Sequence, residues 1–372
     1  MKLAFVFGKN WQLSLAEILA WLEREQTKWQ FIDLTKKALI LSAELDARRV
    51  IKQLGGTLKI VRVEKEFDFK EIDKQDFAEY AGWPVSIYGS HLLLKDVKNT
   101  GLRTHAPPEI VFENPELFKK RTQETALIYG LKTAYFGPTI ALSDPLDYKK
   151  RDDSRPVKRP GLGIAPSRAQ ILVNLSQAKQ SVLDPFCGIG TIPQEALLAG
   201  VKHIYASDVD KKAVEWARKN LQWATKTLEI ETDLTLKTCD AKQLENCFAL
   251  NSIEAIATEP DLGPTLKEKV GRGDAKRIVK YLYNLYAHFL YSARKVTRSK
   301  ARVAMVFPCY NTQRGKVFCE KNFRGWRIID PFERVPEEFK RFLKIPVFII
   351  DEEREPGVKR VVAREFVVFE KE

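Results

Sequence analysis

Short apolar runs and helically spaced apolar residues alternate over the first 64 positions of the chain. Runs of four to seven residues predict strands, and apolar residues three and four positions apart predict helices. The strands are expected at 2–7, 29–33, 38–42 and 58–64, and the helices at 13–24 and 44–54. The order β-α-β-β-α-β is typical of a ferredoxin-like unit. Because that fold serves many unrelated functions, it assigns no activity.

From residue 170 onward, apolar runs alternate regularly with amphipathic stretches. The expected strands cover 181–186, 203–208, 234–239, 254–259, 301–307, 326–333 and 364–370. The expected helices cover 191–199, 211–223, 274–297 and 313–321. This alternation predicts a parallel, doubly wound α/β sheet of the Rossmann-like class.

The sequence between these two regions is more polar. Residues 65–85 are rich in charge, and a second small unit is expected from about 86 to 145. Residues 146–168 contain many basic residues and two or more prolines, which predicts an extended connector. The predicted organisation is an N-terminal ferredoxin-like unit, a second unit, a basic linker and an α/β domain. Their ranges are 1–70, 71–147, 148–168 and 169–372.

The 372 residues carry a formal net charge of +13, and 44% of them are hydrophobic. This length is typical of two or three domains with cores of their own. The basic surplus favours a polyanionic partner such as RNA, although a basic protein without such a partner has the same composition. The residues predicted to contact the RNA backbone are Lys149, Lys150, Arg151, Arg155, Lys158, Arg159, Arg168 and Arg272. A solvated linker is the alternative for the basic run.

The five cysteines form no C-x-x-C pair, and the four histidines do not cluster beside them. The sequence therefore predicts no metal site, no disulfide framework and reduced thiols, as in a cytoplasmic protein. The N-terminus lacks a signal-peptide core, and no apolar run approaches the roughly 20 residues of a membrane span.

A glycine-rich turn follows the apolar run 181–186 and contains Gly188 and Gly190. Glycine lets the backbone turn tightly and lets a ligand approach closely. Pro193 occupies the third position of a dinucleotide fingerprint, and no P-loop G-K-S/T is present. Asp184 would repel a pyrophosphate but attract the ammonium group of a methionine moiety. These features favour S-adenosylmethionine (SAM) as the cofactor.

Two further acids end the next two predicted strands. Asp208 follows Gly190 by 18 residues, which suits a contact to the ribose hydroxyls, and Asp240 is placed to accept from the adenine amine. Any one of these acids could be a helix N-cap, but three at successive strand ends favour a cofactor site. The predicted cofactor-binding residues are Asp184, Phe186, Cys187, Gly188, Gly190, Thr191, Asp208, Val209, Asp240 and Ala241.

The segment 184–191, D-P-F-C-G-I-G-T, resembles motif I of the THUMP-containing tRNA guanosine-N2 methyltransferases, a family of class I SAM-dependent enzymes. Residues 147–156 resemble that family's connector, residues 136–141 resemble the closing strand of its THUMP module, and residues 5–17 resemble its N-terminal unit. The resemblance implies a THUMP-like unit over 71–147, with the stretch 86–132 departing most. It also implies methyl transfer to the exocyclic amine of an extruded guanosine in tRNA.

Amino-methyltransferases usually end their fourth strand in D/N-P-P-Y/F, and the corresponding stretch 258–264 here reads T-E-P-D-L-G-P. By this resemblance Glu259 and the carbonyl at Pro260 would accept from the target amine, so the catalytic residues are expected to be Glu259, Pro260 and Asp261. Asp261 replaces the second proline and Leu262 replaces the aromatic that stacks on the base. Either another ring stacks the base, or the target differs, or the enzyme is slow or inactive.

The segment that follows contains basic residues predicted to contact RNA and aromatics spaced as core. The basic residues are Lys267, Lys269, Arg272, Lys276, Arg277 and Lys280, and the aromatics are Tyr281, Tyr283, Tyr286, Phe289 and Tyr291. The main hypothesis is a tRNA guanosine-N2 methyltransferase. The alternatives are a ribosomal RNA or DNA amino-methyltransferase and a non-catalytic RNA-binding protein with the SAM fold. An accessory subunit stays open; neither a membrane nor a metal is expected.

Overall fold

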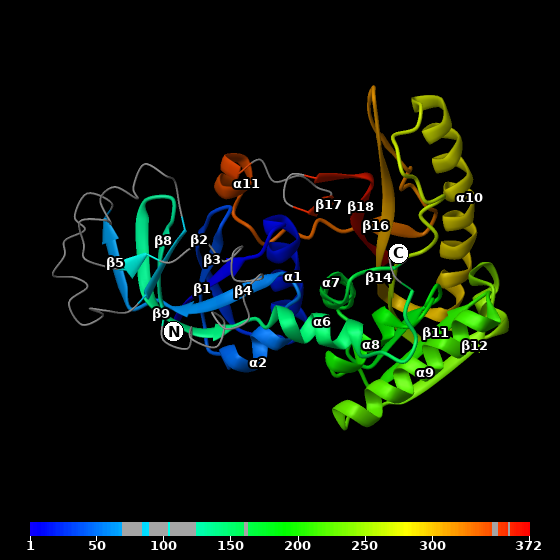
Figure 1. Cartoon of the computed structure of the whole chain (residues 1–372), viewed down its shortest axis with the longest axis horizontal. Coiled ribbons are helices and arrows are strands. Elements are labelled where there is room, and N and C mark those ends of the chain that lie inside the picture. Colours follow the sequence, from blue (N-terminus) through cyan, green and yellow to red (C-terminus); the bar gives the residue numbers. More distant parts are fainter. Residues whose placement is uncertain (69–83, 89–102, 105–123, 160–162, 344–348, 356–357) are drawn as a thin grey trace. The chain divides into compact units, whose positions relative to one another are not determined.

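The computed structural model describes residues 1–68, 84–88, 103–104, 124–159, 163–343, 349–355 and 358–372 (Figure 1). The chain divides into two compact units. The first contains Met1–Ile18, Glu25–Lys150 and Arg334–Ile345. The second contains Leu19–Arg24, Arg151–Glu333 and Pro346–Glu372.

The chain begins with the predicted β-α-β-β-α-β order. Its elements are β1 (Lys2–Phe7), α1 (Trp11–Arg24), β2 (Trp29–Leu34), β3 (Ala38–Ala43), α2 (Ala47–Lys52) and β4 (Thr57–Arg62). The strands lie in the order β2-β3-β1-β4, and β1 pairs antiparallel with both β3 and β4. Asp46 begins α2 by accepting hydrogen bonds from the amides of Arg48 and Arg49. The ferredoxin-like order predicted from the apolar pattern is confirmed.

The same sheet continues beyond β4. Its further strands are β5 (Lys65–Asp68), β6 (Pro84–Tyr88), β7 (Arg103–Thr104), β8 (Thr125–Tyr129) and β9 (Thr133–Leu142). β9 pairs with β4 and β8, so the described strands form one nine-stranded sheet across the expected boundary at residue 70. Most of the stretch 86–132, where the sequence departs most from the THUMP family, lies outside the described residues. That assignment stays a prediction.

The start of the basic connector is helical, where an extended segment was expected. Helix α6 (Pro145–Asp153) begins after Asp144, whose Oδ1 accepts from the amides of Leu146 and Asp147. Pro145 stands at the start of the helix, where its missing N–H costs little. The many charged residues led to the prediction of an extended segment, although Asp144 caps a helix here.

The second unit alternates strands and helices as predicted. Its strands are β10 (Ser181–Asp184), β11 (His203–Asp208), β12 (Asp233–Thr238), β13 (Ile253–Thr258), β14 (Thr297–Thr312), β15 (Gly315–Phe318), β16 (Trp326–Ile328), β17 (Ile349–Glu355) and β18 (Val358–Lys371). Its helices are α7 (Pro166–Ser176), α8 (Thr191–Leu198), α9 (Lys211–Leu228), the 3₁₀ helix η3 (Ala241–Asn246) and α10 (Arg272–Val296). A further short helix, α11 (Glu337–Leu343), belongs to the first unit.

The sheet of the second unit has the order β12-β11-β10-β13-β14-β18-β16. Strands β10 to β14 are parallel, whereas β18 pairs antiparallel with β14, so the expectation of an all-parallel sheet is wrong at this edge. The helix expected at 313–321 is also wrong. Gly315 has φ 93°, which reverses the chain and pairs β15 with the end of β14.

Helices α7, α8 and α9 follow one another over one face of this sheet, and α10 and η3 pack together over the other (Figure 1). The core beneath α10 combines strand residues such as Leu183 and Ile256 with Leu282, Tyr286 and Phe289 of the helix. Because side chains alternate along a strand, each parallel strand contributes to both cores and ends at the same edge of the sheet. Among the described helices, none is long and apolar enough to cross a membrane.

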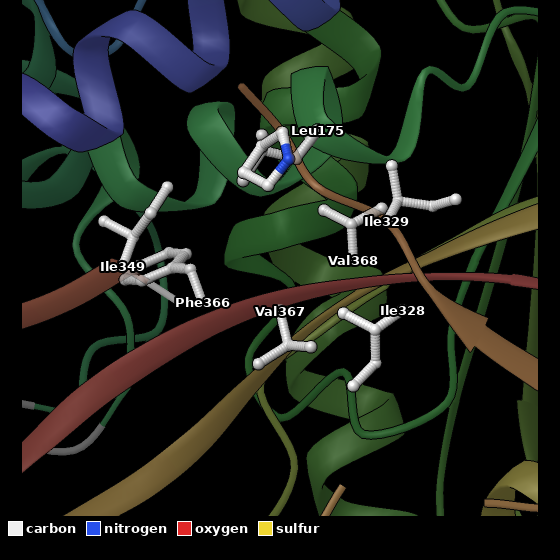
Figure 2. A pocket seen from close by; sticks show the side chains of 8 residues that line it. Leu175, Ile328, Ile329, Ile349, Phe366, Val367 and Val368 are labelled. Atoms are coloured by element: carbon white, nitrogen blue, oxygen red, sulfur yellow. The ribbon is translucent and has the colours of Figure 1, made fainter. Parts of the chain in front are cut away.

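One small cavity lies between α7 and the antiparallel edge of the sheet (Figure 2). Its volume of about 10 Å³ corresponds to roughly one water molecule. Its lining is wholly apolar, from Leu175, Ile328, Ile329, Pro331, Ile349, Phe366, Val367 and Val368. A dry void of this size is a packing defect and offers no ligand site.

Candidate active site

The turn after β10 is held by backbone hydrogen bonds to β11. The amide of Cys187 donates to the Ser207 carbonyl at 2.9 Å, and the amide of Gly188 donates to Asp208 Oδ2 at 3.0 Å. Gly188 and Gly190 have φ of 51° and 87°, a region that favours glycine. A β-carbon at Gly190 would also lie 3.3 Å from Ala217 of α9. The sequence prediction of a tight glycine turn is confirmed.

A buried asparagine secures the same turn from α9. Asn220 Nδ2 donates to the carbonyls of Ile189 at 2.9 Å and Val157 at 3.1 Å, and its Oδ1 accepts from the Val157 amide. The side chain is fully buried. Sequence reasoning missed this residue. Nothing in the helix pattern distinguishes a buried asparagine with this role from a solvated one.

Asp184 lies beneath the turn, at the carboxyl end of β10. Its Oδ1 accepts from Thr258 Oγ1 at 2.7 Å and from the Phe186 amide at 3.2 Å. Burial, together with the neighbouring carboxylates of Asp208 and Glu259, raises the pKa of Asp184 to about 7, against the lowering effect of these two hydrogen bonds. Asp184 thus joins β10 to β13. A cationic ligand group near Asp184 would stabilise its ionised carboxylate. The contact between Asp184 and the ammonium group of the cofactor stays a prediction.

The other two predicted acids end neighbouring parallel strands. Asp208 ends β11 and accepts from the Gly188 and Asp210 amides, so it ties its own strand end to the glycine turn. Asp240 follows β12 and caps η3 by accepting from the Lys242 amide at 2.9 Å. The N-cap alternative therefore holds for Asp240. A carboxylate oxygen can accept two hydrogen bonds, so capping leaves acceptor capacity at both acids.

Val209 is 71% exposed beside Asp208. An apolar side chain held in water at the strand edge presents a face that an adenine ring could cover. Ala241, at the start of η3, is buried.

The structure pairs Cys239 with Cys247 as a disulfide, with the Cα atoms 6.4 Å apart. The expectation that all thiols are reduced is therefore wrong. The two cysteines flank η3, and because their spacing of eight residues matches no metal-binding or redox motif, the pair could not be predicted from the sequence. Cys187 is a buried thiol whose pKa burial raises well above its usual range, so it is a poor nucleophile, as predicted.

Glu259, the first residue after β13, is held by an arginine that sequence reasoning missed. Arg364 Nε and Nη2 of β18 donate to Glu259 Oε2 and Oε1 at 2.6 and 3.0 Å. The Glu259 carboxylate also raises the pKa of Arg364 against the opposing effect of burial. The pair fixes the carboxylate in orientation and compensates its charge. Each oxygen keeps a second lone pair for another donor.

Two buried tyrosines fix the rest of the T-E-P-D-L-G-P loop. Tyr286 Oη donates to the Asp261 carbonyl, and Tyr310 Oη donates to the Leu262 carbonyl, each at 2.6 Å. The amide of Gly263 donates to Asp261 Oδ1 at 2.9 Å. Gly263 has φ 91°, and a β-carbon there would lie 2.2 Å from Tyr310 Oη. In the described part of the chain the Pro260 carbonyl keeps no hydrogen-bond partner.

A groove of about 460 Å³ opens beside this loop. Its lining comes from the loop and from α10: Asp261, Gly263, Pro264, Arg277, Ile278 and Tyr281. The expectation that the α10 aromatics are mostly core is confirmed for Tyr286 and Phe289, whereas Tyr281 and Tyr291 are 68% and 64% exposed. These two positions follow the helical spacing but lie on its outer face.

The same region of the chain is similar to a known family. Residues 153–327 match the family described as RMKL-like, methyltransferase domain. The match covers slightly less than half of the 372 residues. The match covers α8 to α10 and the loop at Glu259, so every element of the site described above except Arg364 lies within it.

Two curated relatives are similar to part of this chain. A tRNA (guanine(10)-N2)-dimethyltransferase of Pyrococcus abyssi is 33% identical over 138 residues, which are 37% of this chain and 40% of the relative. The enzyme of the same name from Methanothermobacter thermautotrophicus is 32% identical over 164 residues, 43% of this chain and 44% of the relative. The chain thus spans less than half the length of the curated relatives it matches.

A solved structure shares the fold over the whole chain. TrmN from Thermus thermophilus is 16% identical, with a TM-score of 0.53 and complete coverage of both chains. At this identity the likeness shows the fold alone. It confirms the Rossmann-like methyltransferase fold predicted from the strand and helix pattern.

The predicted RNA-binding residues divide into three groups. Exposed cations that keep the prediction are Lys149, Lys150, Lys158, Arg159 and Arg272. Arg151 and Arg155 are buried: Arg151 pairs with Glu195 at 3.1 Å, and Arg155 donates to Thr191 Oγ1 at 2.7 Å. For these two the predicted phosphate contact is wrong, because their charges are used inside the fold. Arg168 pairs with Asp351 at 3.3 Å.

Proposed function

We propose that this chain is a SAM-dependent methyltransferase that transfers a methyl group to the exocyclic N2 amine of a guanosine in tRNA. One observation carries the proposal: in the region that matches the RMKL-like family, the acid-bearing strand ends and the T-E-P loop form one connected site. The hydrogen bond from Thr258 to Asp184 links the two directly. The relatives' name, tRNA (guanine(10)-N2)-dimethyltransferase, supports guanine N2 as the acceptor.

The residues at the strand ends fit this cofactor. When bound, SAM supplies an electrophilic methyl group on a sulfonium centre. Asp208 would accept from the ribose hydroxyls, Asp240 from the adenine amine, and the exposed Val209 would cover one face of the adenine. Asp184 would lie behind the glycine turn as the nearest negative charge to the methionine ammonium.

On the acceptor side, Glu259 and the Pro260 carbonyl would each accept one N–H of the target amine. Holding both N–H groups directs the nitrogen lone pair outward, toward the methyl donor, and positioning of this kind is a large part of such catalysis. Arg364 keeps Glu259 in one rotamer, and the tyrosine contacts keep the loop rigid. The loop therefore presents its acceptors without reorganising.

The partner in this proposal is RNA, in the cytoplasm where tRNA is modified. The net charge of +13 and the exposed cations of the connector and of the start of α10 favour phosphate contacts. A polyanion bound this way loses affinity as salt increases.

The test is incubation of the purified chain with methyl-labelled SAM and unmodified bulk tRNA, followed by nucleoside analysis. We expect label in N2-methylguanosine or N2,N2-dimethylguanosine. Glu259→Gln is expected to abolish it, whereas Glu268→Gln, an exposed glutamate nearby, serves as the matched control.

Label in another nucleoside, or only in ribosomal RNA or DNA, would move the proposal to that substrate. SAM binding with no transfer to any nucleic acid would favour a non-catalytic RNA-binding protein. The replacements at Asp261 and Leu262 are the observation that favours this second function.

A further inference from the structure

The T-E-P-D-L-G-P loop lacks the aromatic that would stack on an extruded base, yet an exposed tyrosine lines the groove beside it. Leu262 occupies the aromatic's position, and Tyr310 holds its carbonyl. Tyr281 of α10 is 68% exposed and lines the groove together with Asp261, Gly263 and Pro264. A large aromatic kept in water beside a rigid loop has an unused face of the kind on which bases stack.

The groove also presents an acceptor. Asp261 uses Oδ1 to accept from the Gly263 amide, which fixes the side chain, and Oδ2 remains for a ligand. Within the described part of the chain, no lysine or arginine lies within 4.0 Å of this carboxylate. An exposed carboxylate without a cationic partner at the wall of a groove is suited to a donor on the ligand.

Guanine supplies such a donor. Its Watson–Crick edge carries N1–H next to the N2 amine, whereas adenine has an acceptor at N1. Asp261, which lines the groove, follows Glu259 by two residues in the same loop. A volume of about 460 Å³ is ample for one base with its ribose.

We propose that Tyr281 is the base-stacking residue of this enzyme and that Asp261 selects guanine by accepting its N1–H. The inference rests on the proposed function and goes beyond it, because Asp261 departs from the usual motif and Tyr281 lies outside it. Asp261 replaces the second proline of the motif and Leu262 replaces its aromatic, and α10 supplies a ring from 19 positions after Leu262.

Stacking is tested first by kinetics and base fluorescence. Tyr281→Ala is expected to lower kcat/KM for tRNA by about 5- to 150-fold, the range measured for loss of a base–aromatic stack. Tyr281→Phe should keep the activity. Tyr291→Ala is the matched control, since this tyrosine is equally exposed on α10 but lies under Lys295. Calorimetric SAM affinity should be unchanged in all three variants.

A second readout does not depend on turnover. A tRNA can be made with 2-aminopurine in place of the guanosine that the methyl-transfer assay labels. Its fluorescence should fall when it binds the wild type, because the base stacks on Tyr281, and should fall less when it binds Tyr281→Ala. If Tyr281→Ala matches Tyr291→Ala in both rate and fluorescence, the stacking role is overturned while the proposed function stands. A wild type that labels no guanosine overturns the proposed function itself.

The selection of guanine is tested with Asp261→Asn and a tRNA that has 2,6-diaminopurine at the same position. This base keeps the 2-amine but has an acceptor at N1. The asparagine can keep the hydrogen bond from Gly263 and offer an N–H to that acceptor. We expect the ratio of rates on guanine and diaminopurine to shift toward diaminopurine by about 10-fold or more. An unchanged ratio overturns the role of Asp261.

Discussion

The bidentate ion pair between Arg364 and Glu259 gives the sharpest test of how the T-E-P-D-L-G-P loop is held. Replacing Arg364 by Met keeps most of the side-chain volume but removes both N–H donors. Glu259 is then left with a side chain only 11% exposed and no counter-charge. Water cannot solvate such a carboxylate fully, so its charge becomes a cost to the folded state.

Breaking one side of a buried ion pair typically costs about 3–5 kcal/mol. Because both side chains keep 11–14% of their surface, we expect the lower end, about 3 kcal/mol of unfolding free energy. Glu259→Gln with Arg364→Met removes both charges and should cost clearly less than Arg364→Met alone. The pair should thus show a coupling energy of about 2 kcal/mol in a double-mutant cycle.

Urea denaturation of the full chain measures these values, using the transition that shifts when SAM is added. The methyl-transfer assay with Arg364→Met should show a lower kcat with the KM for SAM unchanged, because the loop and not the cofactor site has lost its support. Equal destabilisation by Arg364→Met and the double variant would refute the reasoning, since the cost would then come from lost packing rather than from an unpaired carboxylate.

Three further predictions concern other parts of the fold. Burial raises the pKa of Asp184 to about 7, so the protonated carboxyl stabilises the fold below pH 4 and this stabilisation is lost as pH rises through 7. Without SAM, the free energy of unfolding should therefore fall by up to about 4 kcal/mol between pH 4 and pH 7. Asp184→Asn should abolish this pH dependence in denaturation measurements. Cys239→Ser opens an eight-residue loop and should cost about 2.5 kcal/mol, with wild type in reductant behaving alike in thermal melts. Charge reversal of Lys158 and Arg159 should weaken tRNA binding and make its affinity less dependent on salt. Arg151→Met should instead lower the melting temperature and leave the salt dependence of binding unchanged. Equal effects of both changes on tRNA affinity in a binding titration would contradict this prediction.

The strand and helix pattern predicted the methyltransferase fold because each parallel strand is a short, continuous apolar run. The pattern failed where a turn, and not periodicity, decides the structure. Residues 313–321 contain apolar residues compatible with a helix, but Gly315 reverses the chain and β15 pairs with β14. Pairing with a distant strand outweighs local preference there.

The charge pattern had the same limit. Arg151 and Arg155 stand in a basic run with Lys149 and Lys158, and composition treats all four alike. The fold separates them, because α6 turns Arg151 toward Glu195 while its neighbours stay in water. An arginine that pairs with a buried carboxylate and an arginine that is exposed to solvent, free to bind a phosphate, differ only in their surroundings. No local sequence pattern encodes those surroundings.

The T-E-P-D-L-G-P loop depends on contacts that the sequence motif alone does not reveal. The loop's own residues were readable, and so was the loss of its aromatic at Leu262. Its supports are not local: Tyr286 and Tyr310 hold its carbonyls from α10 and β14, and Arg364 holds Glu259 from β18, 105 positions away. We therefore expect that residues elsewhere in the fold can supply what an altered motif lacks. The exposed face of Tyr281 makes that argument testable at a single side chain.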